Sequence, residues 1–151
     1  MQSFNSGQIK GDFNGSALAQ EAVNSGTITG SLWLSGDRDT CTGIGPGLVS
    51  ATPMGEDGVD RLKGGLGLDK PFGDNGDDVL SGGTGDDYLA GWFGNDQMFG
   101  PDDNDNMNGF DGNDTLTGGP GNEKLSGGNG ADLFIFGVGD GRDVLYSFTS
   151  G

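Results

Sequence analysis

The chain has 151 residues, of which 31% are hydrophobic and 34 are glycine, so it is long enough for one domain but too poor in apolar side chains for an ordinary globular core. Its 23 acidic and 7 basic residues give a formal net charge of −16, which makes nucleic acid and anionic membranes poor partners. Cys41 is the only cysteine, so the chain cannot form an internal disulfide or a cysteine-based zinc site, and we predict that its thiol is structural. The sequence has no histidine, which excludes Ser-His-Asp and Cys-His catalytic centres, and we predict no catalysis.

The sequence shows no membrane or targeting segment. No apolar run approaches the ~20 residues needed to cross a bilayer, so we expect no membrane insertion. Residues 1–7 lack the basic and apolar parts of a signal peptide. We therefore expect any export signal to lie away from the N-terminus.

A short repeat organises residues 1–54. Residues 5–11 read Asn-Ser-Gly-Gln-Ile-Lys-Gly, and residues 24–30 read Asn-Ser-Gly-Thr-Ile-Thr-Gly, nineteen residues later. One hypothesis is that residues 1–54 are a β cap formed by the first coils of the solenoid predicted below, without its ligand-bearing turns. The alternative is a separate small β unit or a fragment of a preceding domain, and antiparallel hairpins within residues 7–34 would exclude the solenoid.

Residues 40–55 show no periodicity. They contain Gly43, Gly45, Pro46, Gly47 and Pro53, residue types that favour turns and irregular structure. We predict a loop between the cap and the repeats that follow.

Residues 55–135 consist of nine consecutive nonapeptides. Each begins with a glycine, at positions 55, 64, 73, 82, 91, 100, 109, 118 and 127. The sixth position is acidic in every copy and reads Asp60, Asp69, Asp78, Asp87, Asp96, Asp105, Asp114, Glu123 and Asp132. The fourth is glycine except at Asp103, and the eighth reads Leu62, Pro71, Leu80, Leu89, Met98, Met107, Leu116, Leu125 and Phe134.

This pattern predicts a flattened solenoid. The first six residues of each copy should form a turn whose glycines adopt φ values barred to other residues, and the last three a short strand with its eighth residue inward. Two copies then make one coil of eighteen residues. A single nonapeptide is most simply a solvated turn, but nine in phase favour the solenoid.

The nonapeptide resembles the RTX (repeats-in-toxin) repeat Gly-Gly-x-Gly-x-Asp-x-U-x, in which U is a large apolar residue. Residues 82–90 match it at every specified position. The resemblance implies an all-β fold, a right-handed parallel β-roll (β-solenoid) with Ca²⁺ ions bound in the glycine-rich turns. Calcium prefers six to eight oxygen ligands, which carboxylates and backbone carbonyls can supply together.

The family's ligand scheme, carried onto this chain, places each ion between turns eighteen residues apart, with each aspartate bridging two ions. The earlier turn gives its second- and fourth-position carbonyls and its aspartate; the later turn gives its first- and third-position carbonyls and its own aspartate. For the turns that begin at Gly73 and Gly91, the carbonyls are those of Asp74, Gly76, Gly91 and Phe93.

The candidate metal ligands therefore share the turn positions of the repeat. The carboxylates are those of Asp60, Asp69, Asp78, Asp87, Asp96, Asp105, Asp114 and Asp132. The carbonyls of the first and third positions are those of Gly73, Gly82, Gly91, Gly100, Gly109, Gly127, Asn75, Thr84, Phe93, Asp102, Asp111 and Asn129. Those of the second and fourth positions are Gly65, Gly83, Gly58, Gly67, Gly76, Gly85, Gly94 and Gly112.

The two edges of the roll differ. The first edge holds Asp60, Asp78, Asp96, Asp114 and Asp132, each two residues after a glycine, and predicts four well-formed sites. The second edge holds Asp69, Asp87, Asp105 and the longer Glu123, with Pro101 and Pro120 in its turns, Pro71 in the core and Asp103 at a glycine position. It predicts two acceptable sites and one poor or empty site, which brings the total to about six to seven ions.

Residues 136–151 are predicted to close the roll as a C-terminal capping segment. Residues 130–136 and 139–145 resemble the terminating segment of RTX rolls. We expect Phe134, Phe136, Leu145 and Phe148 to form its apolar plug.

The resemblance further implies a secreted, extracellular module of Gram-negative bacterial origin, which is unfolded in the calcium-poor cytoplasm and folds in the calcium-rich exterior.

 Family members usually carry an export signal beyond the repeats, and this chain stops three residues after Phe148, so we expect that signal to be absent or removed here. The partners expected are calcium ions, together with a second copy of the chain or a parent enzyme or toxin domain.

Two functions remain open beside a bare calcium-folding module. One is an accessory module of a larger secreted enzyme, such as a protease, lipase or mannuronan epimerase; only five basic residues lie in or after the repeats, which disfavours alginate as its ligand. The other is a structural or adhesive assembly element. Its open solenoid ends, or the aromatic residues Trp92, Phe93, Phe99 and Phe110, would contact neighbouring copies of the chain. The simpler explanation of these aromatics is partial packing over adjacent turns.

Overall fold

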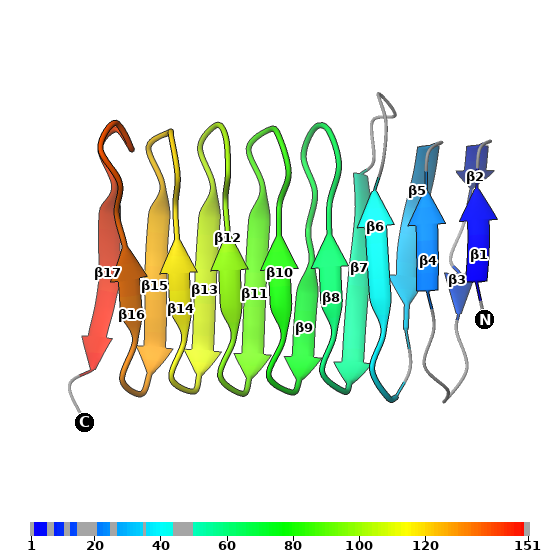
Figure 1. The fold of residues 1–151 in the computed structure, drawn as a ribbon, viewed down its shortest axis with the longest axis horizontal. Coiled ribbons are helices and arrows are strands. Elements are labelled where there is room, and N and C mark those ends of the chain that lie inside the picture. Colours follow the sequence, from blue (N-terminus) through cyan, green and yellow to red (C-terminus); the bar gives the residue numbers. More distant parts are fainter. Residues whose placement is uncertain are drawn as a thin grey trace.

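The computed structural model describes residues 2–5, 8–10, 13–14, 21–24, 27–34, 36–43 and 50–149, and side chains within 32–34, 36–42 and 52–146. Within these residues the chain forms two parallel β-sheets that face each other and share one small core (Figure 1). Strands β1 and β17 lie at opposite ends of the row of coils (Figure 1). The described part contains no helix long and apolar enough to span a membrane.

The strands alternate between the sheets along the chain. The first sheet contains β1 (Gln2–Asn5), β4 (Glu21–Asn24), β6 (Thr40–Gly43), β8 (Arg61–Lys63), β10 (Val79–Ser81), β12 (Gln97–Phe99), β14 (Thr115–Thr117) and β16 (Leu133–Ile135). The second contains β2 (Gln8–Lys10), β5 (Thr27–Trp33), β7 (Ser50–Asp57), β9 (Phe72–Asn75), β11 (Tyr88–Phe93), β13 (Asn106–Asp111), β15 (Lys124–Asn129) and β17 (Val144–Thr149). Strand β3 (Phe13–Asn14) pairs with β5. The predicted all-β parallel solenoid is therefore confirmed.

The register of the strands follows the sequence repeats. Where two nonapeptide strands pair, the partners lie eighteen positions apart, as Leu80 and Met98 do. In the N-terminal part Asn5 pairs with Asn24, at the nineteen-residue spacing of the sequence repeat. Strands β2 and β5 also pair in parallel, not as a hairpin. The strands that precede the nonapeptides thus lie in the same two sheets.

The core is one residue wide along each strand, as the eighth-position pattern predicts. Its buried members are Leu32, Leu34, Cys41, Leu62, Leu80, Leu89, Met98, Met107, Leu116 and Leu125. Burying each of these side chains contributes about 1.5–3 kcal/mol. Few side chains make this contribution in a chain of 151 residues, so apolar burial alone is a weak source of stability.

Two predicted boundaries were wrong. Residues 40–43 and 50–55 were predicted as a loop, but they lie in strands β6 and β7. The glycines and prolines of this segment do not prevent strand formation, and Cys41 of β6 enters the core. Residues 44–49 lie outside the described part. The strands of the second sheet also continue into the predicted turns, and β11 and β13 have six residues each. Trp92 and Phe110 permit this by adopting φ values of 77° and 74°, and parallel pairing resumes at these two residues after one unpaired position.

The predicted apolar plug is partly confirmed. Phe134 and Leu145 pack against the core. Phe136 is 47% exposed, because β16 ends at Ile135 and Phe136 lies beyond the strand, before the turn at 138–139. The side chain of Phe148 lies outside the described residues.

Candidate metal sites

The acidic residues of the sixth position form two ladders, one along each edge of the roll. Each precedes a strand, and Asp60, Asp78, Asp96 and Asp114 on the first edge are at most 1% exposed. On the second edge Asp69, Asp87, Asp105 and Glu123 are at most 3% exposed. Asp132, in the last turn of the first edge, is half-buried. The fold thus brings the predicted carboxylates of each edge into a single row.

On the first edge, one oxygen of each carboxylate accepts a hydrogen bond from the backbone of the preceding coil. The Asp60 N–H donates to Asp78 Oδ1 at 2.7 Å, and the Asp78 N–H donates to Asp96 Oδ1 at 2.8 Å. The same bond joins Asp96 to Asp114 at 2.8 Å and Asp114 to Asp132 at 3.0 Å. The repeated bond gives every carboxylate of this edge the same orientation.

The second oxygen of most of these carboxylates has no hydrogen-bond partner although it is buried. This holds for Oδ2 of Asp60, Asp78, Asp87, Asp96, Asp105 and Asp114, for Oδ1 of Asp69, and for both oxygens of Glu123. A buried charge without a partner costs several kcal/mol. A row of such oxygens therefore needs protons or cations for the folded state to be stable.

Burial raises the pKa of these carboxyl groups, and hydrogen bonds from the backbone partly offset the effect. The pKa rises to about 7 for Asp60, Asp69, Asp96 and Asp105, and to about 6 for Asp78, Asp87 and Asp114. Neighbouring carboxylates add to the rise, as Asp78 and Asp114 do for Asp96. The ladder therefore disfavours its own charged form in the absence of a cation.

Glycine at the first position lets these oxygens approach one another. A Cβ added to Gly73 would lie closer than 3.0 Å to both Asp78 Oδ2 and the carbonyl oxygen of Gly91. The same clash with an aspartate Oδ2 and the next coil's glycine carbonyl arises at Gly55, Gly91 and Gly109. An unpartnered carboxylate oxygen and a backbone carbonyl thus converge beside each of these glycines.

The fourth-position glycines are required for a different reason. Gly58, Gly76, Gly94 and Gly112 have φ values between 128° and 156°, and an added Cβ would overlap a carbonyl oxygen of the preceding coil. Gly67 and Gly85 take φ values of 98° and 114° on the second edge. Asp103 adopts φ 74°, as an aspartate can, and its Oδ2 accepts a hydrogen bond from the Gly85 N–H at 3.0 Å.

The third-position carbonyls already accept one hydrogen bond each. The carbonyls of Asn75, Phe93, Asp111 and Asn129 accept from the fourth-position glycine of the preceding coil at 2.8–2.9 Å, and that of Thr84 accepts at 2.7 Å. A carbonyl oxygen has two lone pairs, so each retains one. These carbonyl oxygens therefore already accept one hydrogen bond, whereas the unpartnered carboxylate oxygens accept none.

The second edge is less regular than the first. Asp69, its first acidic residue, turns one oxygen back to the Gly65 N–H of its own turn at 2.8 Å. Among the described residues no bond links the Asp105 N–H to Glu123, so the ladder is interrupted there. The Glu123 N–H instead donates to Asp143 Oδ1 at 3.2 Å, and burial together with this second carboxyl raises the pKa of Glu123 to about 8.

Two members of the ladders were not predicted. Asp39 is buried, and its N–H donates to Asp60 Oδ1 at 2.6 Å, so it continues the first edge toward the N-terminus. Asp143 continues the second edge after Glu123. Asp39 lies two residues before Cys41, which belongs to the core, and Asp143 lies two residues before Leu145, which packs against the core. The Asp-x-apolar spacing could have identified them, but insertions of two or three residues break the period of nine.

The donor set fits calcium. In the described residues no point is surrounded by three or more acidic, cysteine or histidine side chains, so side chains alone do not complete a site. Carboxylate and carbonyl oxygens together supply the hard ligands that calcium prefers in flexible geometry. They lack the nitrogen and sulfur ligands that favour zinc.

The repeats match a known family. Residues 72–107, 100–134 and 108–145 match the model of the RTX calcium-binding nonapeptide repeat. Residues 72–145 are RTX repeats. The RTX roll of this chain therefore belongs to a calcium-binding repeat family, and its parallel solenoid is the fold that this assignment implies. Neither the comparison with curated proteins nor that with solved structures found a match.

Proposed function

We propose that this chain is a secreted, non-catalytic module that folds when calcium binds in the turns of its RTX roll. The observation that carries the proposal is the row of buried carboxylates whose second oxygen has no hydrogen-bond partner. Within the described residues none of them forms an ion pair with lysine or arginine. Calcium would supply the missing positive charge and would bind to oxygens that the fold already holds in place.

The ligands of this proposal are the sixth-position carboxylates with the carbonyls of the glycine-rich turns. We assign four ions to the first edge, where the hydrogen-bonded ladder runs unbroken from Asp60 to Asp132. The second edge would hold two ions and a poorer third near Glu123. Residues 1–54 would serve as the N-terminal cap and residues 136–151 as the C-terminal cap of the roll in 55–135.

The energetics make calcium a sufficient switch. At a concentration about a hundredfold above the dissociation constant, each bound ion adds ~2.7 kcal/mol to the stability of the folded state. Two or three ions then match the lower end of ordinary domain stability, ~5 kcal/mol. Since calcium is scarce inside cells and abundant outside them, this linkage would keep the chain unfolded before export and fold it afterwards.

The hydrodynamic radius of the purified chain tests the proposal. In millimolar calcium we expect the compact radius of the solenoid, and with excess chelator the larger radius of an expanded chain. The change should reverse when calcium is restored. A radius that stays the same in calcium and in chelator would overturn calcium-dependent folding.

A further inference from the structure

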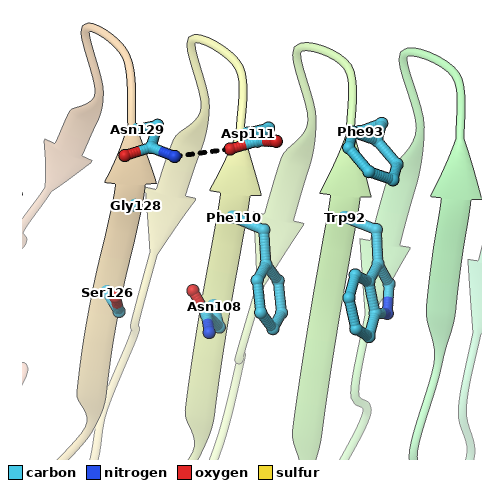
Figure 2. Close-up of a pocket in the computed structure, with 8 residues that line it drawn as sticks. All are labelled: Trp92, Phe93, Asn108, Phe110, Asp111, Ser126, Gly128 and Asn129. Atoms are coloured by element: carbon cyan, nitrogen blue, oxygen red, sulfur yellow. Dashed lines mark hydrogen bonds between the residues drawn. The ribbon is translucent and has the colours of Figure 1, made fainter.

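The outer face of the second sheet carries a groove that the metal sites do not explain (Figure 2). It crosses β11, β13 and β15 and has a volume of ≈ 320 Å³. Apolar and polar side chains share its lining, which consists of Trp92, Phe93, Asn108, Phe110, Asp111, Ser126, Gly128 and Asn129. Mixed linings of this kind are typical of ligand sites.

An aromatic stack forms one part of the groove. The rings of Trp92 and Phe110 lie face to face, with centroids 4.3 Å apart and planes 2° from parallel. Both residues occupy the second position of the repeat and pair with each other across β11 and β13. Figure 2 shows the two rings side by side, projecting from the same face of the sheet. Trp92 remains 40% exposed, so the stack is a surface feature and not part of the core.

The next place in this row has no side chain. Phe110 pairs with Gly128 on β15, and neighbouring strands lie about 4.8 Å apart. A flat ring above Gly128 would therefore meet the second face of Phe110 at about the spacing at which Trp92 meets the first. On the far side of β15 lies β17, where Gly128 pairs with Phe148, whose side chain lies outside the described residues, and Ser126 pairs with Tyr146. The space above Gly128 on β15 is thus a slot, and the ring of Phe110 forms one of its walls.

Backbone geometry keeps this slot open. Gly128 has φ 103°, and an added Cβ would overlap the carbonyl oxygen of Phe110. A larger residue at this position would be strained as well as obstructed. The gap in the aromatic row therefore follows from the backbone at Gly128, which differs from that at Trp92 and Phe110, where φ is 77° and 74°.

Polar groups border the slot. Asn108 and Ser126 lie side by side on β13 and β15 (Figure 2), and both are half-buried. The Asp111 carboxylate accepts a hydrogen bond from Asn129 Nδ2 at 2.6 Å, which fixes both side chains at one end. Amide, hydroxyl and carboxylate groups beside an aromatic face suit a ring that is apolar on its face and carries hydroxyls on its edge.

We propose that this slot binds a pyranose ring of a neutral polysaccharide, stacked on Phe110 and hydrogen-bonded through Asn108, Ser126 and Asp111. The C–H groups of such a ring match the electron-rich aromatic face. A nucleobase is also flat, but the lining of the slot holds the Asp111 carboxylate and no lysine or arginine, which disfavours nucleic acid and acidic polysaccharides. The site goes beyond the proposed calcium-dependent folding and uses the folded roll as its scaffold.

Affinity electrophoresis tests this site. The full chain in calcium is run through gels that contain barley β-glucan, xyloglucan, dextran or, as the acidic comparison, alginate. Phe110→Ala removes the wall of the slot, and Ser126→Tyr fills the slot, since Tyr146 shows that this register position accepts a tyrosine. Phe99→Ala is the control, because Phe99 is 37% exposed on the other sheet. Circular dichroism in calcium verifies that each variant is folded.

We expect at least one of the neutral polysaccharides to retard the wild-type chain, with a dissociation constant that rises at least about tenfold in Phe110→Ala and in Ser126→Tyr and stays unchanged in Phe99→Ala. The proposal is overturned if no neutral polysaccharide retards the folded chain, if alginate alone does, or if retardation survives both slot variants. Self-association of the wild-type chain that is lost in Phe110→Ala without sugar, measured by sedimentation, would assign the slot to a second copy and would also overturn it.

Discussion

The backbone N–H of Asp78 donates a 2.8 Å hydrogen bond to Oδ1 of Asp96, the equivalent residue one coil later. The bond leaves Oδ2 of Asp96 buried and without a hydrogen-bond partner. A single carboxylate thus has two separate tasks, since one oxygen joins neighbouring coils and the other is available to a cation. Substitutions can separate these tasks, because asparagine keeps the first oxygen and removes the charge.

Asp96→Asn should weaken calcium binding while it preserves the hydrogen bond between coils. We expect the calcium midpoint of folding to rise about tenfold, equivalent to about 1.4 kcal/mol, as measured by circular dichroism. Asp77→Asn is the matched control, because Asp77 is exposed and the equivalent place in the next coil is already Asn95. Equal midpoints for the two variants would show that Asp96 binds no calcium.

The two edges should respond unequally to the loss of charge. Glu123 interrupts its ladder and lies against Asp143, whereas Asp78 lies within an unbroken row. We therefore expect Asp78→Asn to raise the calcium midpoint more than Glu123→Gln does. Isothermal titration calorimetry of the two variants measures the sites lost, and a larger loss in Glu123→Gln would contradict the assignment of the edges.

Gly76→Ala should prevent the coils from stacking. Gly76 has φ 144°, and an added Cβ would overlap the carbonyl oxygen of Gly58; we expect a loss of more than about 2 kcal/mol of unfolding free energy in calcium. Gly139→Ala is the control, because Gly139 also has a positive φ of 103° but open space around it. Urea unfolding in saturating calcium compares them, and similar losses would mean that the backbone contact between coils is unimportant.

Acid should partly replace calcium. Burial raises the pKa of Asp60 and Asp96 to about 7 in the metal-free fold, whereas an unfolded aspartate has a pKa of about 3.9. The folded state therefore binds more protons between these values, so its stability is fully present below about pH 3.9 and is lost as pH rises through about 7. With chelator present, we expect more β-structure at about pH 5 than at about pH 8, and the opposite order would contradict the burial of these carboxylates.

Cys41 should report whether the N-terminal strands fold together with the repeats. Burial raises the pKa of its thiol to about 12, and Cys41 is 7% exposed in the core, so it should react slowly with a thiol reagent in calcium. We expect the reaction to accelerate at least about a hundredfold with chelator. Equal rates in both conditions would show that β6 folds independently of calcium.

The nonapeptide period allowed most of the roll to be predicted from the sequence, because each turn position has its own steric requirement. Met98 and Leu116 in the core, and Asp96 and Asp114 at the edge, follow from this period alone. The burial pattern, however, does not set where a strand ends. Trp92 and Phe110 extend β11 and β13 by adopting a conformation that few non-glycine residues occupy.

Asp39 and Asp143 were missed for a related reason. Their coils contain twenty-one and twenty residues between paired positions instead of eighteen. Extra residues in an exposed turn cost little, so the three-dimensional stack tolerates them while the sequence period is lost. The aromatic groove was also unpredictable, since the sequence shows Trp92 and Phe110 but not that Gly128 completes the row beside them.

A calcium titration followed by far-UV circular dichroism, with magnesium as the control, tests the central claim most directly. If cations held by Asp60, Asp78, Asp96 and Asp114 stabilise the roll, β-signal will appear cooperatively with calcium. Magnesium at the same concentration will not produce it, because magnesium requires stricter octahedral geometry and loses water reluctantly. Full β-signal in chelator at neutral pH, unchanged by added calcium, would contradict the account.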